Sequence, residues 1–462
     1  MKTYNTSYIF GITLIATLGG LLFGYDTAVI SGAEKAIGAY LIEPLEMGSF
    51  AHGATVSSAL IGCIIGGAIS GFLSNIFGRK KTLQLAGFLF FTSSLAAAFP
   101  EFLFFEKGQP TTGLLMMFNF YRIYGGIGVG LASAVCPMYI GEIAPAEIRG
   151  RLVSCNQFAI IFGMLVVYFV NWGIANGQTI EWINDMGWRY MFLSEAIPAG
   201  LFFLLLFFVP ETPRYLALTH KEDQALLVLE KINTSKENAK RILDEITSTI
   251  SEKTKANIFS YGKKVIIIGI LLSVFQQFVG INVCLYYAPR IFESMGVARD
   301  ASMFQTIVMG LVNVIFTVVA IMTVDKWGRK PLLITGSIGM AVGMIAISVL
   351  SYFDIISILT LVFIIIFTAS FMMSWGPICW VYISELFPNK IRGQAVAIAV
   401  AAQWTANYII SSTYHGMMDF SHAMTYGFYG VMAIISALFV WKMVPETKGK
   451  SLEEIEKFWK KN

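Results

Sequence analysis

Long apolar stretches recur along the whole chain, and no other feature of the sequence constrains the fold as strongly. A helix needs about 20 consecutive apolar residues to cross the hydrocarbon core of a bilayer. The stretches are continuous rather than alternating, which excludes a transmembrane strand barrel. Only 13% of the 462 residues are charged, whereas a soluble domain is about a quarter charged. The sequence therefore predicts an all-α integral membrane protein.

Twelve of these stretches are predicted to span the bilayer. They cover residues 8–31, 53–77, 82–99, 113–138, 152–173, 190–209, 264–288, 302–324, 331–351, 357–382, 394–414 and 425–443. Alternate connections are rich in Lys and Arg, and such connections stay in the cytoplasm. The rich connections hold Arg79, Lys80, Lys81, Arg149, Arg151, Lys326, Arg329, Lys330, Lys390 and Arg392. We therefore expect a multi-pass protein of the cell inner (plasma) membrane with both termini cytoplasmic.

Three motifs occur twice, in the same order, at matching places in two sets of six stretches. They pair Phe77-Gly78-Arg79-Lys80 with Trp327-Gly328-Arg329-Lys330, residues 141–150 with 384–393, and Val209-Pro210-Glu211-Thr212 with Val444-Pro445-Glu446-Thr447. A duplicated half is the expected build of a transporter whose substrate site lies between two halves. The predicted units are two six-helix bundles at 1–214 and 263–444, a linker at 215–262 and a cytoplasmic tail at 445–462.

The linker is polar, but some of its apolar residues keep helical spacing, such as Leu226 with Leu229 and Ile242 with Ile246. This spacing predicts short amphipathic helices on the cytoplasmic side. A solvated linker without helices is the alternative.

Each half also repeats one Glu and two Arg on its cytoplasmic side. These residues are Arg79, Glu142 and Arg149 in the first half and Arg329, Glu385 and Arg392 in the second. Held together at helix ends, such groups would latch the cytoplasmic side shut and release it on opening. Basic loops that merely anchor the topology are the alternative. Anchoring does not require a Glu at a fixed position, so the pattern favours the latch.

Taken together, the two Gly-Arg-Lys loops, the two Glu…Arg-Gly loops and the two Pro-Glu-Thr exits resemble the sugar porter branch of the major facilitator superfamily. Residues 23–32, 276–282 and 401–404 resemble the bacterial D-xylose–proton symporters of that branch, with animal glucose facilitators more distant. The resemblance spans essentially the whole chain. It implies the major facilitator fold, with two pseudo-symmetric six-helix bundles. It also implies a proton-coupled monosaccharide importer that works by alternating access, with D-xylose as the expected sugar.

Charged side chains inside membrane helices are costly and usually functional. Asp26, Arg122 and Glu195 are three such residues, and helix geometry places them at one depth in the outer third of the membrane. A carboxylate beside an Arg stays ionised, and in a dry site without that partner it takes up a proton. The residues alone fit a proton switch and a static buried ion pair equally well. The resemblance favours the switch, because related uncoupled facilitators tend to lack this acidic residue.

A sugar presents hydroxyls around its rim and apolar C–H faces, so binding one requires amides and aromatic surfaces. Amides within a membrane are costly unless they face a cavity. A cluster of amides with two indoles therefore predicts a ligand site, and hydrogen bonds between helices are the alternative. The cluster comprises Gln157, Gln276, Gln277, Asn282, Asn313, Gln403, Trp380 and Trp404. Gly376 and Pro377 precede Trp380 and are expected to break its helix.

The resemblance assigns sugar contacts to most of this cluster. The assigned residues are Gln157, Gln276, Gln277, Asn282, Trp380, Gln403 and Trp404, with Tyr286, Asn313 and Gly376 nearby. One position departs from the family pattern, because Met164 stands where the symporters have a second glutamine in the fifth helix. The methionine removes hydrogen bonds and changes the space beside the sugar, so the preference between pentoses and hexoses stays open.

Other functional classes fit the sequence less well. An uncoupled facilitator, or a symporter for arabinose, glucose or galactose, remains an alternative, while a membrane sugar sensor would need a larger cytoplasmic region. The sequence shows no phosphate loop, no nucleophile with a base and no metal-ligand cluster, and it predicts no enzyme, cofactor, metal or disulfide. The basic residues lie in loops, which argues against nucleic acid. The expected partners are a monosaccharide, a proton and the lipid bilayer, with the monomer as the functional unit.

Overall fold

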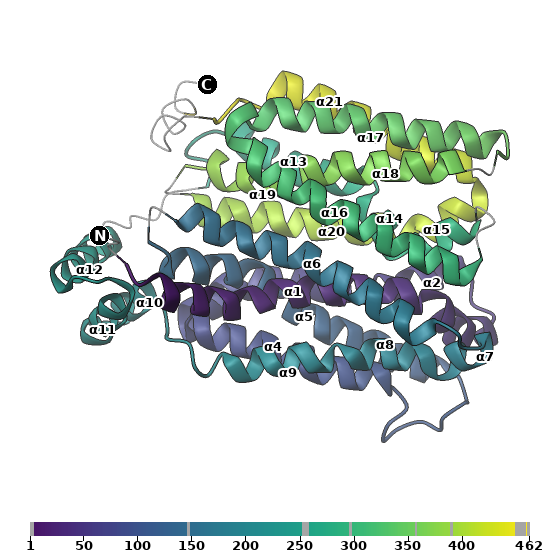
Figure 1. The fold of residues 1–462 in the computed structure, drawn as a ribbon, viewed down its shortest axis with the longest axis horizontal. Helices are drawn as coiled ribbons and strands as arrows, with labels where there is room; N and C mark the ends of the chain where they lie inside the picture. The colour runs from purple at the N-terminus through teal and green to yellow at the C-terminus, as the bar shows by residue number, and fades with distance from the viewer. Residues whose placement is uncertain are drawn as a thin grey trace.

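The computed structural model describes residues 4–145, 148–251, 258–294, 298–355, 358–388, 391–448 and 459. Every regular element in these ranges is a helix. Figure 1 shows the long helices side by side in one elongated bundle, with α1–α9 on one side and α13–α21 on the other. The two sides correspond to the two halves that the repeated motifs predict.

The helices of the two halves follow the predicted spans, with several interruptions. The first half contains α1 (Thr6–Ile37), α2 (Ser49–Val56), α3 (Ser58–Phe77), α4 (Arg79–Ala98), α5 (Thr112–Ile143), α6 (Arg149–Ala175), α7 (Ile180–Trp182), α8 (Trp188–Ser194) and α9 (Ala196–Leu205). The second half contains α13 (Lys263–Phe278), α14 (Ile281–Tyr286), α15 (Ala288–Ser294), α16 (Arg299–Trp327), α17 (Arg329–Tyr352), α18 (Ile358–Met373), α19 (Trp375–Leu386), α20 (Arg392–Phe420) and α21 (His422–Met443).

Nine helical stretches in the described ranges are long and apolar enough to cross a membrane by length and composition. The remaining predicted spans fall on α4, on α8 with α9, and on α20. The helix α4 begins with three basic residues, and α20 carries polar residues along its length. Polar residues within a membrane helix face the protein interior rather than lipid, so the composition of α20 already suggests that it lines a site.

Four predicted spans are interrupted, and of these breaks only the one in the tenth was expected from the sequence. The second is broken at Ser57, between α2 and α3. The seventh is broken at Gly280, whose φ of 86° lies in the left-handed region that favours glycine. The tenth is broken at Ser374, just before the Gly376–Pro377 pair at which a break was expected. The sixth is divided at Glu195. Breaks of this kind free backbone carbonyls inside the membrane, where they are tolerated only if protein or a cavity surrounds them.

Each half closes one end, the one predicted to be cytoplasmic, with the same hydrogen-bond network. In the first half, Glu211 accepts from the backbone N–H groups of Arg79 and Lys80, at 3.1 and 3.0 Å. Arg79 donates to Glu142 at 2.9 Å, and the Thr212 hydroxyl donates to the same carboxylate at 2.6 Å. The carboxylate of Glu211 thus satisfies free N–H groups at the start of α4. This explains the Pro-Glu-Thr motif, whose role the sequence analysis did not assign.

The second half repeats this network residue by residue. Glu446 accepts from the N–H groups of Arg329 and Lys330 at 3.1 and 2.9 Å. Arg329 donates to Glu385 at 2.9 Å, and Thr447 donates to Glu385 at 2.7 Å. The repeat therefore extends from sequence to contacts, which is what a duplicated half predicts.

The linker segment is helical, in agreement with its apolar spacing. It contains α10 (Pro213–Leu218), α11 (Glu222–Ile232) and α12 (Lys236–Ser251). Figure 1 shows these helices outside the bundle, beside the N-terminus. The backbone N–H of Asn5 donates to the Ile232 carbonyl at 2.8 Å, which ties the start of α1 to α11.

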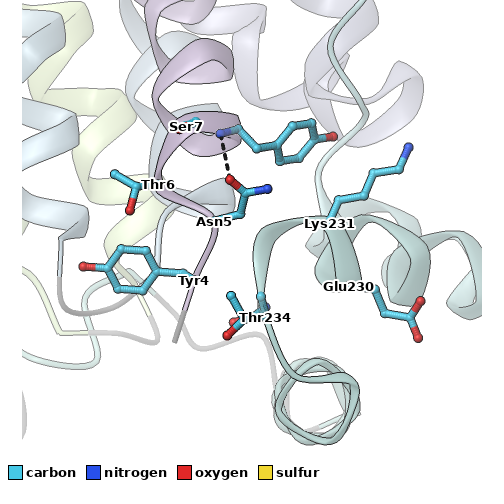
Figure 2. Close-up of a pocket in the computed structure, with 9 residues that line it drawn as sticks. Tyr4, Asn5, Thr6, Ser7, Glu230, Lys231 and Thr234 are labelled. Atoms are coloured by element: carbon cyan, nitrogen blue, oxygen red, sulfur yellow. Dashed lines mark hydrogen bonds between the residues drawn. The ribbon is translucent and has the colours of Figure 1, made fainter. Parts of the chain in front are cut away.

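An open pocket lies at this junction (Figure 2). Residues 4–8 line one side of it, and residues between Glu230 and Thr234 line the other. Asn5 caps α1 there by accepting from the Tyr8 N–H at 3.2 Å. None of the predicted sugar-site residues lines this pocket, so it belongs to the packing of the linker against the N-terminus rather than to the predicted site.

Candidate functional site

Asp26, Arg122 and Glu195 are brought together from three elements of the first half. Arg122 of α5 donates to the Asp26 carboxylate of α1 at 2.7 Å. All three side chains are buried, and Glu195 interacts electrostatically with both of the others. The guanidinium also lies 5.0 Å from the ring centroid of Phe192, so apolar surface closes one side of the cluster.

This cluster holds two carboxyl groups for one guanidinium, and part of its hydrogen-bonding capacity is unused. With both carboxyls ionised, Asp26 Oδ2, Glu195 Oε1 and Arg122 Nε have no hydrogen-bond partner among the described residues, whereas a proton on one carboxyl lets Asp26 and Glu195 share a hydrogen bond. Buried polar atoms are normally paired. Carboxylate oxygens without partners are acceptors that a proton can occupy. The arrangement therefore suits uptake and release of a proton better than a fully satisfied static ion pair would.

The amides of the second half form one connected cluster. Gln276 of α13 donates to the carbonyls of Trp375 and Gly376, the first two residues of α19, at 2.8 and 3.3 Å. Gln403 of α20 donates in turn to Gln276 Oε1. Gln277 donates to the same oxygen at 3.3 Å. The three amides are thus hydrogen-bonded to one another and to the first turn of α19, directly after the break at Ser374.

The cluster continues along α14 and α20. Asn282 donates to Gln277 Oε1 across the Gly280 break. Asn407, which the sequence analysis missed, donates to the Tyr286 hydroxyl at 3.2 Å. It lies one helical turn after Gln403, and this spacing could have identified it. The predicted residues Gln276, Gln277, Asn282, Tyr286 and Gln403 therefore lie in one region.

Three buried polar atoms of the predicted sugar site have no hydrogen-bond partner in the described part of the chain. They are Gln403 Oε1, Trp404 Nε1 and Asn313 Oδ1. Leaving a buried polar atom unpaired costs about 1–3 kcal/mol. Helix-to-helix hydrogen bonding, the alternative to a ligand site, does not account for atoms that reach no other helix. A polar ligand accounts for them.

The site lies against the first half as well. The ring of Trp404 lies 5.5 Å from that of Phe23 in α1, measured between centroids. Tyr168 of α6 donates to the Leu285 carbonyl of α14 at 3.2 Å. Gln157 and Trp380 are partly buried on α6 and α19, and Met164 is buried on α6. Elements of both halves therefore meet at the cluster.

The predicted latch residues pair within each half rather than between halves. Arg79 pairs with Glu142, and Arg329 with Glu385. Arg149 is exposed, and the side chain of Arg392 lies outside the described part of the structure. Among the described residues, the charged pairs that link the two halves lie instead at the opposite end of the bundle, where Glu34 pairs with Arg290 and Lys35 with Glu293. The sequence analysis did not identify this outer set.

The model of the family described as "Sugar (and other) transporter" matches residues 12–459. The chain belongs to this sugar transporter family. The match covers both halves, the linker and every residue of the two clusters.

Relatives of this sugar transporter agree in length as well as sequence. The D-xylose-proton symporter of Escherichia coli strain K12 is 52% identical, over 99% of this chain and 96% of its own length. The arabinose-proton symporter of Bacillus subtilis is 41% identical, over 99% of this chain and 96% of its own. The glucose facilitated diffusion protein of Zymomonas mobilis is 37% identical, over 97% of each.

Comparison with solved structures establishes the fold of the chain. The xylose transporter XylE from E. coli, in a partially occluded inward-open conformation, matches with a TM-score of 0.88 at 50% identity, over 96% of this chain and all of that one. The proton:xylose symporter XylE bound to 6-bromo-6-deoxy-D-glucose matches with a TM-score of 0.86 at 51% identity, over 99% and 100%. This sugar transporter therefore has the twelve-helix fold of the major facilitator superfamily, built from two six-helix bundles.

Proposed function

We propose that this sugar transporter imports D-xylose together with a proton, by alternating access of a site between its two halves. The relatives support this assignment, because a D-xylose-proton symporter shares about half of its residues with the chain. The observation that carries the proposal is internal to the protein. Buried polar atoms without a partner among the described residues lie on Gln403, Trp404 and Asn313 of the second half, and the buried acidic cluster of the first half has more carboxyl groups than cations.

The amide cluster provides the sugar's binding groups. Each amide offers donors and acceptors. Gln276, Gln277 and Asn282 can therefore pair with a sugar hydroxyl whether it donates or accepts the hydrogen bond. Hydrogen bonds among these amides and to the first turn of α19 hold them in place before the sugar arrives, which reduces the entropy lost on binding. The indoles of Trp380 and Trp404 present apolar faces suited to the C–H surface of a sugar ring. Gln157 contributes an amide from the first half.

The acidic cluster provides the proton site. Asp26, paired with Arg122, and Glu195 share one guanidinium, so a proton neutralises the excess negative charge that burial disfavours. Binding of the proton weakens the pairing between α1 and α5. Because α1 also contacts Trp404 through Phe23, a change at Asp26 is transmitted to the sugar site over a few residues. This coupling makes sugar and proton move together.

The two ends of the bundle act as gates in this proposal. The charged pairs between halves close the extracellular end, and the Glu142 and Glu385 networks hold the cytoplasmic ends of the two halves as rigid units that latch when they meet. The basic connections place both termini in the cytoplasm and the protein in the cell inner membrane. The monomer contains all of these parts and is the proposed functional unit.

Uptake of radiolabelled sugar into proteoliposomes tests this function. With the inside alkaline, we expect D-xylose to accumulate above its external concentration. A panel of xylose, arabinose, glucose and galactose then measures the effect of Met164. Equal final levels with and without the pH gradient would make the protein an uncoupled facilitator. Preferential accumulation of another sugar would replace D-xylose as its substrate.

A further inference from the structure

Four side chains that neither proposed site uses meet between the two halves at the extracellular end. They are Glu34 of α1, His52 of α2, Arg290 of α15 and His415 of α20. Glu34 Oε1 lies 3.1 Å from His52 Nε2 and 2.9 Å from His415 Nε2. The two imidazole rings are tilted by 37° with their centroids 4.3 Å apart. Glu34 and His415 are each 2% exposed.

The four residues come from both halves, and the backbone there is closely packed. Glu34 and His52 belong to the first half, and Arg290 and His415 to the second. A Cβ added to Gly53, next to His52, would lie 2.2 Å from the Ser412 carbonyl oxygen of α20. The side chains of Ser49 and Asp419 are hydrogen-bonded beside the cluster. The cluster is therefore part of the closed extracellular end and must separate when that end opens.

One position in this cluster requires a cation. Arg290 Nη1 lies 2.6 Å from Glu34 Oε1 and 2.6 Å from His415 Nε2. An arginine only donates, so His415 Nε2 accepts and carries no proton. The lone pairs of Nε2 and of the Glu34 carboxylate then face each other at 2.9 Å. Two such acceptors repel unless a cation lies between them, and the guanidinium is that cation.

The same atoms make a good set of ligands for a transition metal. Two imidazole nitrogens and one carboxylate oxygen are the donors that Zn²⁺ binds in open sites with a fourth position for water. The three ligand atoms lie within 4.8 Å of one another. With the ring proton on Nδ1, His415 Nε2 becomes free to bind a metal once Arg290, which now donates to it, moves away. The Arg290 side chain is 36% exposed, so it can rotate into water.

We propose that Glu34, His52 and His415 form an extracellular site for a divalent transition metal such as Zn²⁺, which the ion occupies by displacing Arg290. His52 binds through the same Nε2 that now faces Glu34, with its ring proton on Nδ1. Because the ligands come from both halves, the bound ion links the halves and holds the extracellular end closed. Occupancy of this site therefore inhibits transport.

Calorimetric titration of ZnCl₂ into the purified full-length protein tests the site directly and does not depend on which sugar is carried. We expect one Zn²⁺ site. His52→Ala and His415→Gln should each weaken binding by more than the 10–100-fold that loss of an outer-shell partner costs. His422→Ala is the matched control, because His422 is an exposed histidine at the start of the next helix, α21. It should leave the isotherm unchanged.

The displacement of Arg290 by the metal has a test of its own, in which Zn²⁺ affinity should rise rather than fall. Arg290→Gln removes the competing cation, so it should bind Zn²⁺ more tightly than the wild type. Melting curves without metal establish that each variant is folded. In proteoliposomes, external Zn²⁺ should inhibit sugar exchange by the wild type and by His422→Ala, but not by His415→Gln. Equal Zn²⁺ affinity in the wild type, His52→Ala and His415→Gln would overturn the proposed site. Unchanged or weaker affinity in Arg290→Gln would overturn the displacement of the guanidinium.

Discussion

Replacing Asp26 with Asn should uncouple sugar movement from the proton gradient while leaving the sugar site intact. The two side chains have nearly the same shape, but the amide does not take up a proton in the physiological range. The hydrogen bond of 2.7 Å from Arg122 then goes to a neutral amide oxygen instead of a carboxylate, which is a weaker bond. Arg122 keeps the Asp26 backbone carbonyl at 3.5 Å and its electrostatic interaction with Glu195. The variant should therefore fold and still bind sugar.

The expected size of the transport defect follows from the driving force. An imposed gradient of two pH units supplies about 2.7 kcal/mol per proton. At one proton per sugar this sustains an accumulation of about 100-fold, because each 1.4 kcal/mol is a factor of ten. Asp26→Asn should reach an inside-to-outside ratio of about one, the value expected with no free energy coupled to transport. Counterflow, which needs no gradient, should persist.

The assay compares uptake and counterflow in proteoliposomes for the wild type, Asp26→Asn and Asp185→Asn. The last is a matched control, because Asp185 is an exposed aspartate that pairs with Lys107 at the surface. It should accumulate sugar like the wild type. Gradient-driven accumulation by Asp26→Asn at the wild-type level would refute the assignment of proton coupling to this carboxylate.

Three further predictions address the other parts of the account. Gln277→Ala and Trp380→Ala should each weaken D-xylose binding by about 1–3 kcal/mol, and calorimetry showing unchanged affinity in both would reduce the amides to helix packing. Glu142→Gln should slow transport without changing sugar affinity, because it disturbs only the cytoplasmic network; transport at the wild-type rate would leave the repeated charges as topology signals. Gly78→Ala should lower the unfolding midpoint, since φ is 91° there and a Cβ would lie 2.2 Å from the capping carboxylate. Gly71→Ala, whose Cβ would contact nothing within 4 Å, should not lower it.

The membrane spans and the duplicated halves could be predicted from sequence, because their causes are local. A segment that crosses lipid must form its backbone hydrogen bonds internally, as a helix does. Each span therefore occurs in the sequence as a continuous apolar stretch. The duplication is likewise visible in the sequence, because the same motifs occur in both halves. Within the first half, Asp26, Arg122 and Glu195 could be placed together from their depths alone, and the structure does bring Arg122 and Asp26 to hydrogen-bonding distance.

Breaks and contacts between distant elements could not be predicted in this way. Glycines recur throughout the predicted spans, and only the packing of the bundle decides that the seventh helix ends at Gly280. The extracellular cluster joins residues at positions 34, 52, 290 and 415. A search for metal ligands at short sequence spacing cannot find such a set, because its members share no segment. The role of Glu211 as a distant cap for α4 was hidden for the same reason.

Proton movement evoked by sugar tests the central claim most directly. The protein is reconstituted into lightly buffered vesicles without any gradient, the membrane potential is clamped with K⁺ and valinomycin, and the external pH is recorded as D-xylose is added. If sugar and proton enter together, the external medium becomes alkaline, and a protonophore abolishes the signal. Entry of D-xylose with no change in external pH would contradict the account.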